Sequence, residues 1–286
     1  MNSVLIISGS SGFIGRYLLE ELKRRDLDYK IFSFGRWNKD VQQKLLIFAE
    51  NHKTYSWNII HLAGANIFAH PWTKSYKKIL WESRIGTVKK IHQTLDTLQV
   101  IPEKIIGISA IGYYGDKEQI ADEFTPSGND FLSRLCVDWE NAYIEASKPG
   151  TSLSILRLGV VMGQSGGAMQ KMIGPFGSGL MFLPGGGNFP LNWISLHDVI
   201  RVILDLLNGS LPSGIYNLVN NANDTYRTFV EKIKTKNNIW LPSFSIPLFV
   251  LKIILGKRLN AVVSRTKVVP KVLNQQNFDF NENIFC

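Results

Sequence analysis

The chain has 286 residues, of which 45% are hydrophobic and 19% charged, with a formal net charge of +9 and two cysteines. This composition excludes a disulfide-stapled scaffold and a disordered chain, and it provides a core for one large domain or two small ones. The lysines and arginines are spread out and form no basic tract, so a nucleic-acid partner is not expected. The histidines do not have the spacing of metal ligands, so a metal site is not expected. No signal peptide precedes the first apolar segment, which predicts a cytoplasmic protein.

Apolar strands alternate with amphipathic helices along the first part of the chain. Strands are expected over 4–7, 29–36, 58–64, 104–110 and 152–163, and helices over 40–52, 75–98 and 129–147. This alternation predicts the α/β class, as a Rossmann-type doubly wound parallel sheet with helices on both faces. Ligands of such sheets bind beyond the carboxyl ends of the strands. The connection over 37–58 is short, which indicates that one usual strand is lost or reduced.

The rest of the chain has a different texture. Residues 164–189 are glycine-rich and are expected to form an insertion that covers a pocket, while 190–220 complete the first domain, 1–163. Residues 221–286 are expected to form a smaller helical C-terminal substrate domain. Its apolar stretch 241–256 is too short to span a bilayer. A buried or partly buried helix is favoured there over a membrane-surface helix, and no membrane partner is expected.

The stretch GSSGFIG places Gly9, Gly12 and Gly15 between the first strand and the first helix. Gly9 would make the tight turn, Gly12 would let a pyrophosphate approach the backbone, and Gly15 would let the helix pack on its strand. The N-terminus of the helix adds N–H groups and a dipole that favour an anion. A dinucleotide site is therefore predicted. Further contacts from this turn are expected at Ser11, Phe13 and Ile14.

Arg36 follows the second strand, where an NAD-binding domain normally presents an acidic residue to the ribose 2′-hydroxyl. No Asp or Glu stands at this strand end. An arginine can instead bind a 2′-phosphate through two hydrogen bonds, or stack on adenine. NADP (NADPH) is therefore favoured over NAD as the cofactor. The alternative is a solvated loop arginine.

The sequence resembles the extended short-chain dehydrogenase/reductase superfamily, and within it an atypical NAD(P)-dependent epimerase-like family with a distinctive C-terminal domain. The segments that carry the resemblance follow in order along nearly the whole chain: SGSSGFIGRYL, FGR, HLAGANI, WTKSYKKILWESRIGT, SAIGYYGDK, FLSRLCVDWE, LRLGVVMGQSGGAM, NWISLHDVIRVI and TKVVPKVLNQQNFDF. The resemblance implies a Rossmann-type NADP-binding domain with a smaller substrate domain. The cofactor contacts it implies are Gly9, Gly12, Gly15, Gly35, Arg36, Leu62, Ala63, Gly64, Arg84 and Val160.

The resemblance also implies where a catalytic pair would stand. Active members of the superfamily carry a Tyr-x-x-x-Lys pair on the helix after the fourth strand, where the tyrosine transfers a proton and the lysine lowers its pKa. This chain has Leu132 and Cys136 at those positions, or Cys136 and Glu140 if the alignment shifts by four residues. Neither alignment contains the pair. Cys136 is interpreted as a small buried residue, with a reactive thiol as the alternative.

Tyr113 and Lys117 have the required spacing, but they follow the fourth strand too closely and are expected in a turn. Ser109 and Tyr114 therefore remain the candidates for polar contact with a substrate. Arg157, within the fifth strand, is interpreted either as a contact for an anionic substrate or as a loop anchor.

These observations favour an NADP(H)-binding oxidoreductase or epimerase that acts on a small polar carbonyl, hydroxyl or sugar-nucleotide substrate. The missing pair favours the alternative, a non-catalytic NADPH-binding sensor. A third interpretation is a basic module that docks on an anionic surface through residues 252–271.

Overall fold

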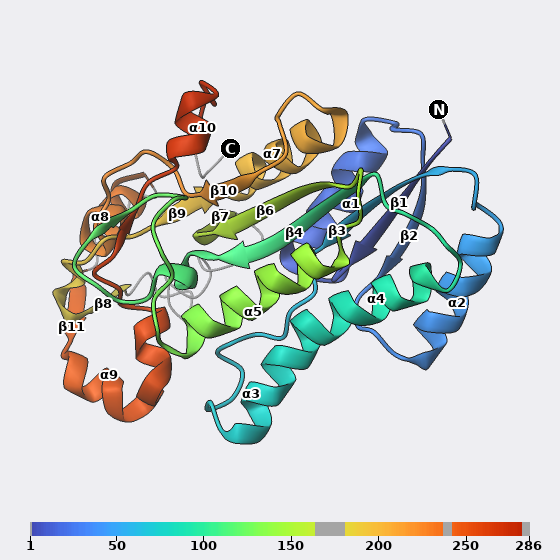
Figure 1. Cartoon of the computed structure of the whole chain (residues 1–286). Helices are drawn as coiled ribbons and strands as arrows, with labels where there is room; N and C mark the ends of the chain where they lie inside the picture. The colour runs from blue at the N-terminus through green and yellow to red at the C-terminus, as the bar shows by residue number, and fades with distance from the viewer. Residues whose placement is uncertain (1, 164–180, 237–241, 282–286) are drawn as a thin grey trace.

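The computed structural model describes residues 2–163, 181–236 and 242–281. Its centre is a six-stranded sheet of order β10-β6-β4-β3-β1-β2, in which every neighbouring pair is parallel (Figure 1). The strands are β1 (Ser3–Ser8), β2 (Tyr29–Phe34), β3 (Ser56–His61), β4 (Lys104–Ala110), β6 (Ser152–Leu158) and β10 (Ile215–Leu218). The predicted Rossmann-type sheet is confirmed.

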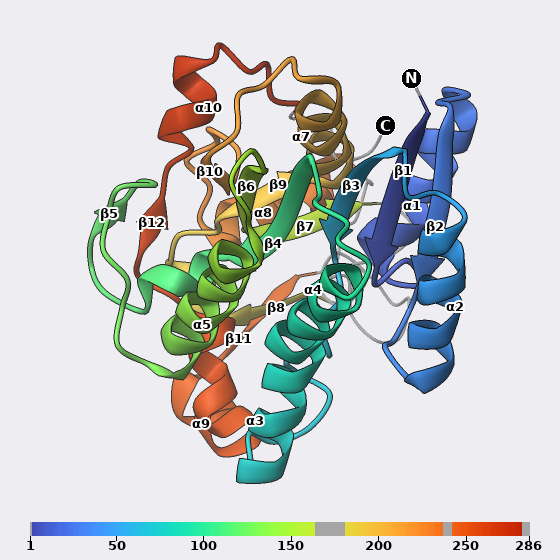
Figure 2. The ribbon, with the colours of Figure 1, turned by 45° about the vertical axis from the view of Figure 1, so that its right-hand side comes forward.

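Helices cover both faces of this sheet (Figure 2). One face carries α1 (Phe13–Arg24) and α7 (Leu196–Asn208), and the other carries α2 (Lys39–Glu50), α4 (Thr87–Asp96) and α5 (Phe131–Ala146). Successive side chains of a strand point to opposite faces. Thus Leu5 of β1 belongs to the core that includes Leu18 of α1, whereas Ile6 belongs to the core that includes Leu45 of α2. Burial on both faces explains why the strands are continuously apolar.

One connection explains how the sheet departs from its usual form. Between β2 and β3 the chain contains α2 but no strand, so the sheet ends at β2, as the short connection predicted.

The helix expected over 75–98 is interrupted. It consists of α3 (Lys74–Trp81), a π-helical turn (Glu82–Gly86) and α4. Turns of this kind inside helices are frequent at functional sites.

The C-terminal part contains α8 (Tyr226–Lys236), α9 (Leu248–Leu255) and α10 (Lys271–Gln275). It is not purely helical as expected, because β11 (Ser243–Ile246) pairs with β8 (Met181–Pro184), and β12 (Lys267–Val268) pairs with β5 (Ile120–Ala121). A third parallel pair joins β7 (Val160–Gly163) to β9 (Trp193–Ser195). Most of the predicted insertion, residues 164–180, lies outside the described residues. The division into domains stays a prediction.

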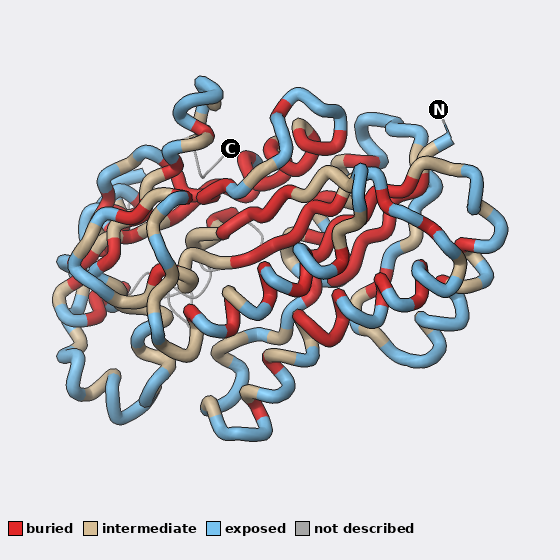
Figure 3. The backbone as a smooth tube through the Cα atoms, in the orientation of Figure 1, coloured by how far each residue is buried: buried red, intermediate tan, exposed pale blue. Residues whose placement is uncertain are grey.

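Burial is uneven across the molecule (Figure 3). The central strands are almost wholly buried, whereas α9 has no buried residue. Of the two alternatives for the stretch 241–256, the partly buried helix is confirmed, because α9 consists of partly buried and exposed residues. Within the part of the chain that the structure describes, no helix is long and apolar enough to cross a bilayer.

Candidate functional site

The turn between β1 and α1 excludes side chains at two of its glycines. Gly9 has a φ of +76°, and a Cβ built there would lie 2.6 Å from backbone atoms of Leu62 and Ala63, just past β3. A Cβ at Gly15 would lie 2.5 Å from the carbonyl oxygen of Gly9. Glycine avoids both clashes, so α1 starts directly against the ends of β1 and β3. This is the geometry that a pyrophosphate site needs; the cofactor contacts of these residues stay a prediction.

The N-terminus of α1 has no side-chain cap. Its N-cap residue, Gly12, forms no side-chain hydrogen bond, and its first turn contains no acidic residue. By contrast, α2, α5 and α7 begin with capping side chains, those of Asn38, Asp130 and Ser195. The first N–H groups of an α-helix lack intrahelical acceptors and carry a partial positive charge. The uncapped start of α1, formed by Phe13 and Ile14, therefore fits a phosphate group.

Gly35 and Arg36 lie beside this turn. A Cβ at Gly35 would overlap the hydroxyl of Ser11, so Ser11 lies against the end of β2. The N–H of Ser10 donates to the carbonyl of Phe34 at 3.0 Å and fixes the same approach. Arg36 is exposed, and its guanidinium forms no hydrogen bond or ion pair with any described residue. Its five donors are thus available next to the uncapped helix.

Arg84 belongs to the π-helical turn, and its side chain reaches the segment that follows β3. Its Nη1 donates to the carbonyl of Leu80 at 3.2 Å and its Nη2 to the carbonyl of Ala65 at 3.1 Å. A Cβ at Gly64 would lie 3.1 Å from its Cζ. Burial lowers the pKa of Arg84, and no carboxylate of the described residues pairs with it. Arg84 is partly buried. Removing a cation from water without a counter-ion costs free energy, and an anionic ligand would offset that cost.

Val160 begins β7, at the same edge of the sheet. Its N–H already donates to the carbonyl of Asn192 at 2.8 Å. A Cβ at Gly163, the last residue of β7, would lie 2.9 Å from the ring of Phe13. The strand therefore ends against the start of α1, close to the glycine turn. Its position agrees with the predicted neighbourhood of the cofactor, and its contact with one stays a prediction.

A buried ion pair lies where β4 and β6 end. Ser109 is directly opposite Arg157 in the register of the two strands, so both side chains face α5. Arg157 donates from Nε and Nη2 to the two carboxylate oxygens of Glu140, at 2.9 and 2.8 Å. The hydroxyl of Ser109 donates to Oε1 of Glu140 at 2.7 Å. Burial by itself lowers the pKa of Arg157, but its hydrogen bonds with Glu140 raise that pKa overall, so the guanidinium stays charged.

Tyr114 completes this network and is fully buried. Its hydroxyl accepts from Nη1 of Arg157 at 3.0 Å and donates to Oδ1 of Asn217 at 2.7 Å. Burial raises the pKa of Tyr114 to about 12, which keeps the phenol neutral. The structure thus brings Ser109 and Tyr114 together, but both hydroxyl protons are donated within the protein. That they contact a substrate stays a prediction.

Tyr113 has different surroundings from its neighbour. It is half-buried, its ring centroid lies 3.5 Å from Cζ of Arg157, and its hydroxyl has no partner among the described residues. Residues Ile111–Tyr114 form a 3₁₀ turn, so the expected placement of Tyr113 in a turn, off α5, is confirmed. Lys117 lies further along this connection and is exposed. Of the two interpretations of Arg157, the structure favours the anchor, because its guanidinium is bonded to protein partners.

Sequence reasoning missed Glu140 as the partner of Arg157. A signal was present, because an arginine inside an apolar strand requires a buried acceptor, and the next helix against that face supplies only a few acids. Cys136, one turn before Glu140 on α5, is also buried. Burial raises the pKa of its thiol to about 12, which agrees with the interpretation of a small packed residue.

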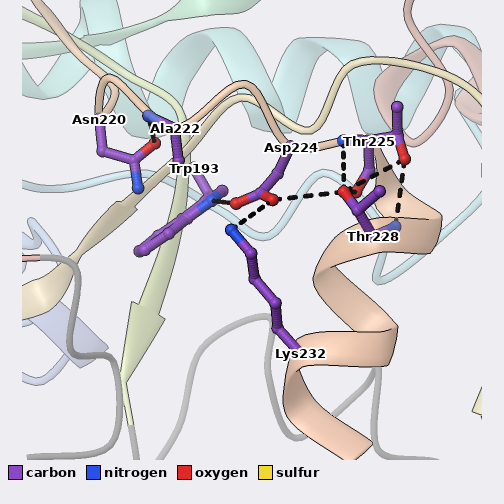
Figure 4. Close-up of polar contacts among 7 residues, drawn as sticks. All are labelled: Trp193, Asn220, Ala222, Asp224, Thr225, Thr228 and Lys232. Atoms are coloured by element: carbon purple, nitrogen blue, oxygen red, sulfur yellow. Dashed lines mark hydrogen bonds and ion pairs between the residues drawn. The ribbon is translucent and has the colours of Figure 1, made fainter. Parts of the chain in front are cut away.

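Trp193 and Asp224 connect the sheet to the C-terminal part (Figure 4). Asp224 accepts from the indole nitrogen of Trp193 at 3.1 Å and pairs with Lys232 of α8 at 2.7 Å. A cavity of about 320 Å³ lies beside them. Its lining includes Asn192, whose amide bonds both Thr266 and Val268. The pair of Asp224 with Lys232 links α8 to β9, and the bonds of Asn192 link β12 to the same region.

The parallel sheet and the glycine turn define a Rossmann-type protein of the dinucleotide-binding class. The sequence model of the NAD dependent epimerase/dehydratase family matches residues 5–218, and the chain belongs to this family. An epimerase family protein of Mycobacterium tuberculosis is 29% identical over 294 residues, which cover 99% of this chain and 95% of that protein. The SDR39U1 homolog of Arabidopsis thaliana, a chloroplastic epimerase family protein, is 28% identical over 302 residues, covering 96% of this chain and 82% of that protein.

Solved structures show the same fold. Human epimerase family protein SDR39U1, crystallised with NADPH, superposes with a TM-score of 0.84 at 23% identity and covers 98% of this chain and 95% of that chain. A dTDP-4-dehydrorhamnose reductase from Bacillus anthracis, in complex with NADP, gives a TM-score of 0.72 at 17% identity, with 97% of this chain and 94% of that chain covered.

Proposed function

We propose that this protein binds NADPH across the carboxyl edge of the sheet and acts as an atypical oxidoreductase or epimerase on a small polar substrate. The observation that carries the proposal is the start of α1, which has no capping side chain and which follows a glycine turn that lies directly against the end of β3. The guanidinium of Arg36, which has no partner among the described residues, lies beside this turn. The human relative crystallised with NADPH supports the choice of cofactor.

In this proposal, each group that lacks a partner among the described residues binds part of the cofactor or substrate. The N–H groups at the start of α1 bind the pyrophosphate, and Arg36 binds the 2′-phosphate through charge-assisted hydrogen bonds. Arg84 supplies a positive charge at the end of β3, where it would balance an anionic group of cofactor or substrate. The bound nicotinamide would supply or accept hydride.

Residues at the end of β4 and in the turn that follows it would position the substrate. Ser109 and Tyr114 were predicted to touch it, and the hydrogen bonds of their hydroxyls support a narrower role, in which they hold Arg157 in place. The ring of Tyr113 rests on that guanidinium. Its hydroxyl then becomes the candidate for contact with the substrate and for proton transfer.

The second candidate function is an NADPH-binding sensor without turnover. It is favoured by α5, which carries Leu132 and Cys136 where the superfamily pair would stand. It is also favoured by the internal hydrogen bonds of Ser109 and Tyr114.

Cofactor choice is tested by titrating NADPH and NADH against the wild-type protein, Arg36→Ala and the control Arg24→Ala, an exposed arginine on α1. Loss of a charge-assisted contact should weaken NADPH binding by about 1.5–3 kcal/mol in Arg36→Ala and leave NADH unchanged. Equal losses for both cofactors would contradict the assignment. Turnover is tested by following NADPH absorbance with small carbonyl compounds, and by a product assay for epimerisation of sugar nucleotides. NADPH binding without either reaction would favour the sensor.

A further inference from the structure

Helix α9 exposes an unusual amount of apolar surface. Leu248–Leu255 reads LFVLKIIL, and none of its residues is buried. The exposed fractions are 81% for Ile253, 68% for Phe249 and 63% for Ile254. Large apolar side chains that gather on one short helix, rather than being scattered singly, mark an interaction site.

The sequence segments that contain α9 and α3 are rich in basic residues. Residues 232–278 include nine Lys or Arg and no Asp or Glu, and residues 51–81 include four Lys and no acid. The two stretches meet, because Nη1 of Arg258, just after α9, donates to the carbonyl of Phe68, which precedes α3, at 3.2 Å. Figures 1 and 2 both show α9 and α3 at the same end of the molecule.

Four lysines here have no acidic partner. Lys74 and Lys78 of α3, Lys252 of α9 and Lys257 just after it are exposed, and their ammonium groups form no ion pair with a described residue. Ile79 of α3 adds a further apolar side chain, 51% exposed. We call the exposed apolar residues and free lysines together the α9 face: Lys74, Lys78, Ile79, Phe249, Lys252, Ile253, Ile254 and Lys257.

We propose that the α9 face docks on a membrane surface that contains anionic phospholipids. Phe249, Ile253 and Ile254 would enter the boundary between headgroups and acyl chains, and the lysines would contact the lipid phosphates. An eight-residue helix is about 12 Å long, so it can lie in this boundary but cannot cross the bilayer. This proposal departs from the sequence-based expectation that the protein has no membrane partner, because the described residues bury no residue of the helix.

Geometry and charge favour this occupant over the two alternatives. A second copy of the chain would bring the same four lysines, and no carboxylate of this face, into a two-fold interface, and like charges brought together oppose binding. The isoleucines with the highest exposure protrude from a helix surface, whereas anchors of protein interfaces fit partner pockets inside a rim. A fluid lipid surface accepts protruding side chains without a shaped pocket.

The test is co-sedimentation of the full chain with phosphatidylcholine vesicles that contain roughly one-quarter phosphatidylglycerol, compared with pure phosphatidylcholine vesicles. Binding is expected to the first kind only, and to weaken as salt is raised. The double variant Ile253→Ser/Ile254→Ser should bind at least about tenfold more weakly, because two apolar anchors are lost. Lys252→Gln/Lys257→Gln should lose about fivefold for each lysine removed.

Matched controls separate docking from misfolding. The double variant Ile47→Ser/Ile144→Ser removes two isoleucines that are also exposed, by 56% and 57%, but lie on α2 and α5. This variant should bind vesicles as the wild type does. NADPH titration and thermal unfolding check that every variant is folded. Equal vesicle binding by wild type and α9 variants would overturn the proposal. A dimer of the wild type in light scattering that the isoleucine variant abolishes, without vesicle binding, would assign the face to a second copy instead.

Discussion

Arg84, which is partly buried, and Arg157, which is buried, both lie near the carboxyl edge of the same sheet, yet their surroundings are opposite. Arg157 has a bidentate carboxylate partner, and every member of its network bonds another. Arg84 bonds only carbonyl groups and one hydroxyl of described residues. A charge that the fold itself neutralises can serve the structure, whereas a charge left without a counter-ion is available to a ligand. The closed network under β4 and β6 and the open edge beyond β1 to β3 should therefore respond differently to mutation.

Among the polar residues compared, the largest effect on stability is expected at Glu140. Glu140→Gln leaves Arg157 charged and buried without its partner, which should lower the free energy of unfolding by about 3–5 kcal/mol. Glu145→Gln is the control, because Glu145 lies on the same helix and pairs with Lys89 at the surface. The control should lose no more than about 1 kcal/mol in urea unfolding. Similar losses for both variants would show that the buried pair is not special.

The glycine turn tests the open edge. Gly9 and Gly150 both have positive φ, but a Cβ at Gly150 meets nothing within 4 Å. Alanine at either position should cost about 1–3 kcal/mol in backbone strain. Gly9→Ala should lose about 1–3 kcal/mol more from its clash with the end of β3, and it should lose NADPH binding. Urea unfolding and nucleotide titration measure the difference, which should be absent if the turn can relax.

Adjacent tyrosines provide the next comparison. Tyr114→Phe removes a buried hydroxyl and leaves Oδ1 of Asn217 without that donor, so it should cost about 1–3 kcal/mol of stability. Tyr113→Phe should change stability by less than about 0.5 kcal/mol. If turnover is found, Tyr113→Phe should instead reduce kcat. A large stability loss in Tyr113→Phe would mean that its hydroxyl belongs to the closed network.

A histidine pair on the other side of β4 gives a pH dependence. Nε2 of His61 lies 3.1 Å from Nε2 of His92, and burial lowers both pKa values, that of His92 to about 4. The unfolded chain takes up these protons below its ordinary histidine pKa of about 6.5, whereas the folded protein resists them. Stability should thus be complete above pH 6.5 and should fall on the order of 1–2 kcal/mol by about pH 5.5. Thermal unfolding of His92→Gln should show a smaller loss over this range, and an identical loss would exclude His92 as a source.

A small effect on stability is also expected at Arg84. Arg84→Gln removes a partly buried charge without a carboxylate partner but keeps hydrogen-bond donors, so the unfolding free energy should change by no more than about 1 kcal/mol. Affinity for NADPH or substrate should fall, because the charge left open for an anion is gone. The stability loss is to be compared with that of Glu140→Gln in the same urea series. Equal losses would erase the distinction between the open edge and the closed network.

Much of the fold and of the open edge could be predicted from the sequence. Strand and helix periodicity is local, and so is the glycine spacing that makes the turn after β1. The position of Arg36 also follows from chain order, because parallel strands end at one edge. The network under β6 could not be predicted in the same way. Its members, Ser109, Glu140 and Arg157, meet only through the register of β4 with β6 and the packing of α5.

The exposure of helix α9 also could not be predicted from the sequence. Its apolar composition favoured a buried or partly buried helix, because hydrophobic side chains usually gain by leaving water. How far they are buried depends on which other elements pack against them, and the described residues leave none of the residues of α9 fully buried. By itself the sequence determined the sheet, the glycine turn and the family, since these follow from short-range patterns. Only the tertiary structure decided which charges are paired and which surfaces are uncovered, because pairing and coverage depend on contacts between segments distant in the chain.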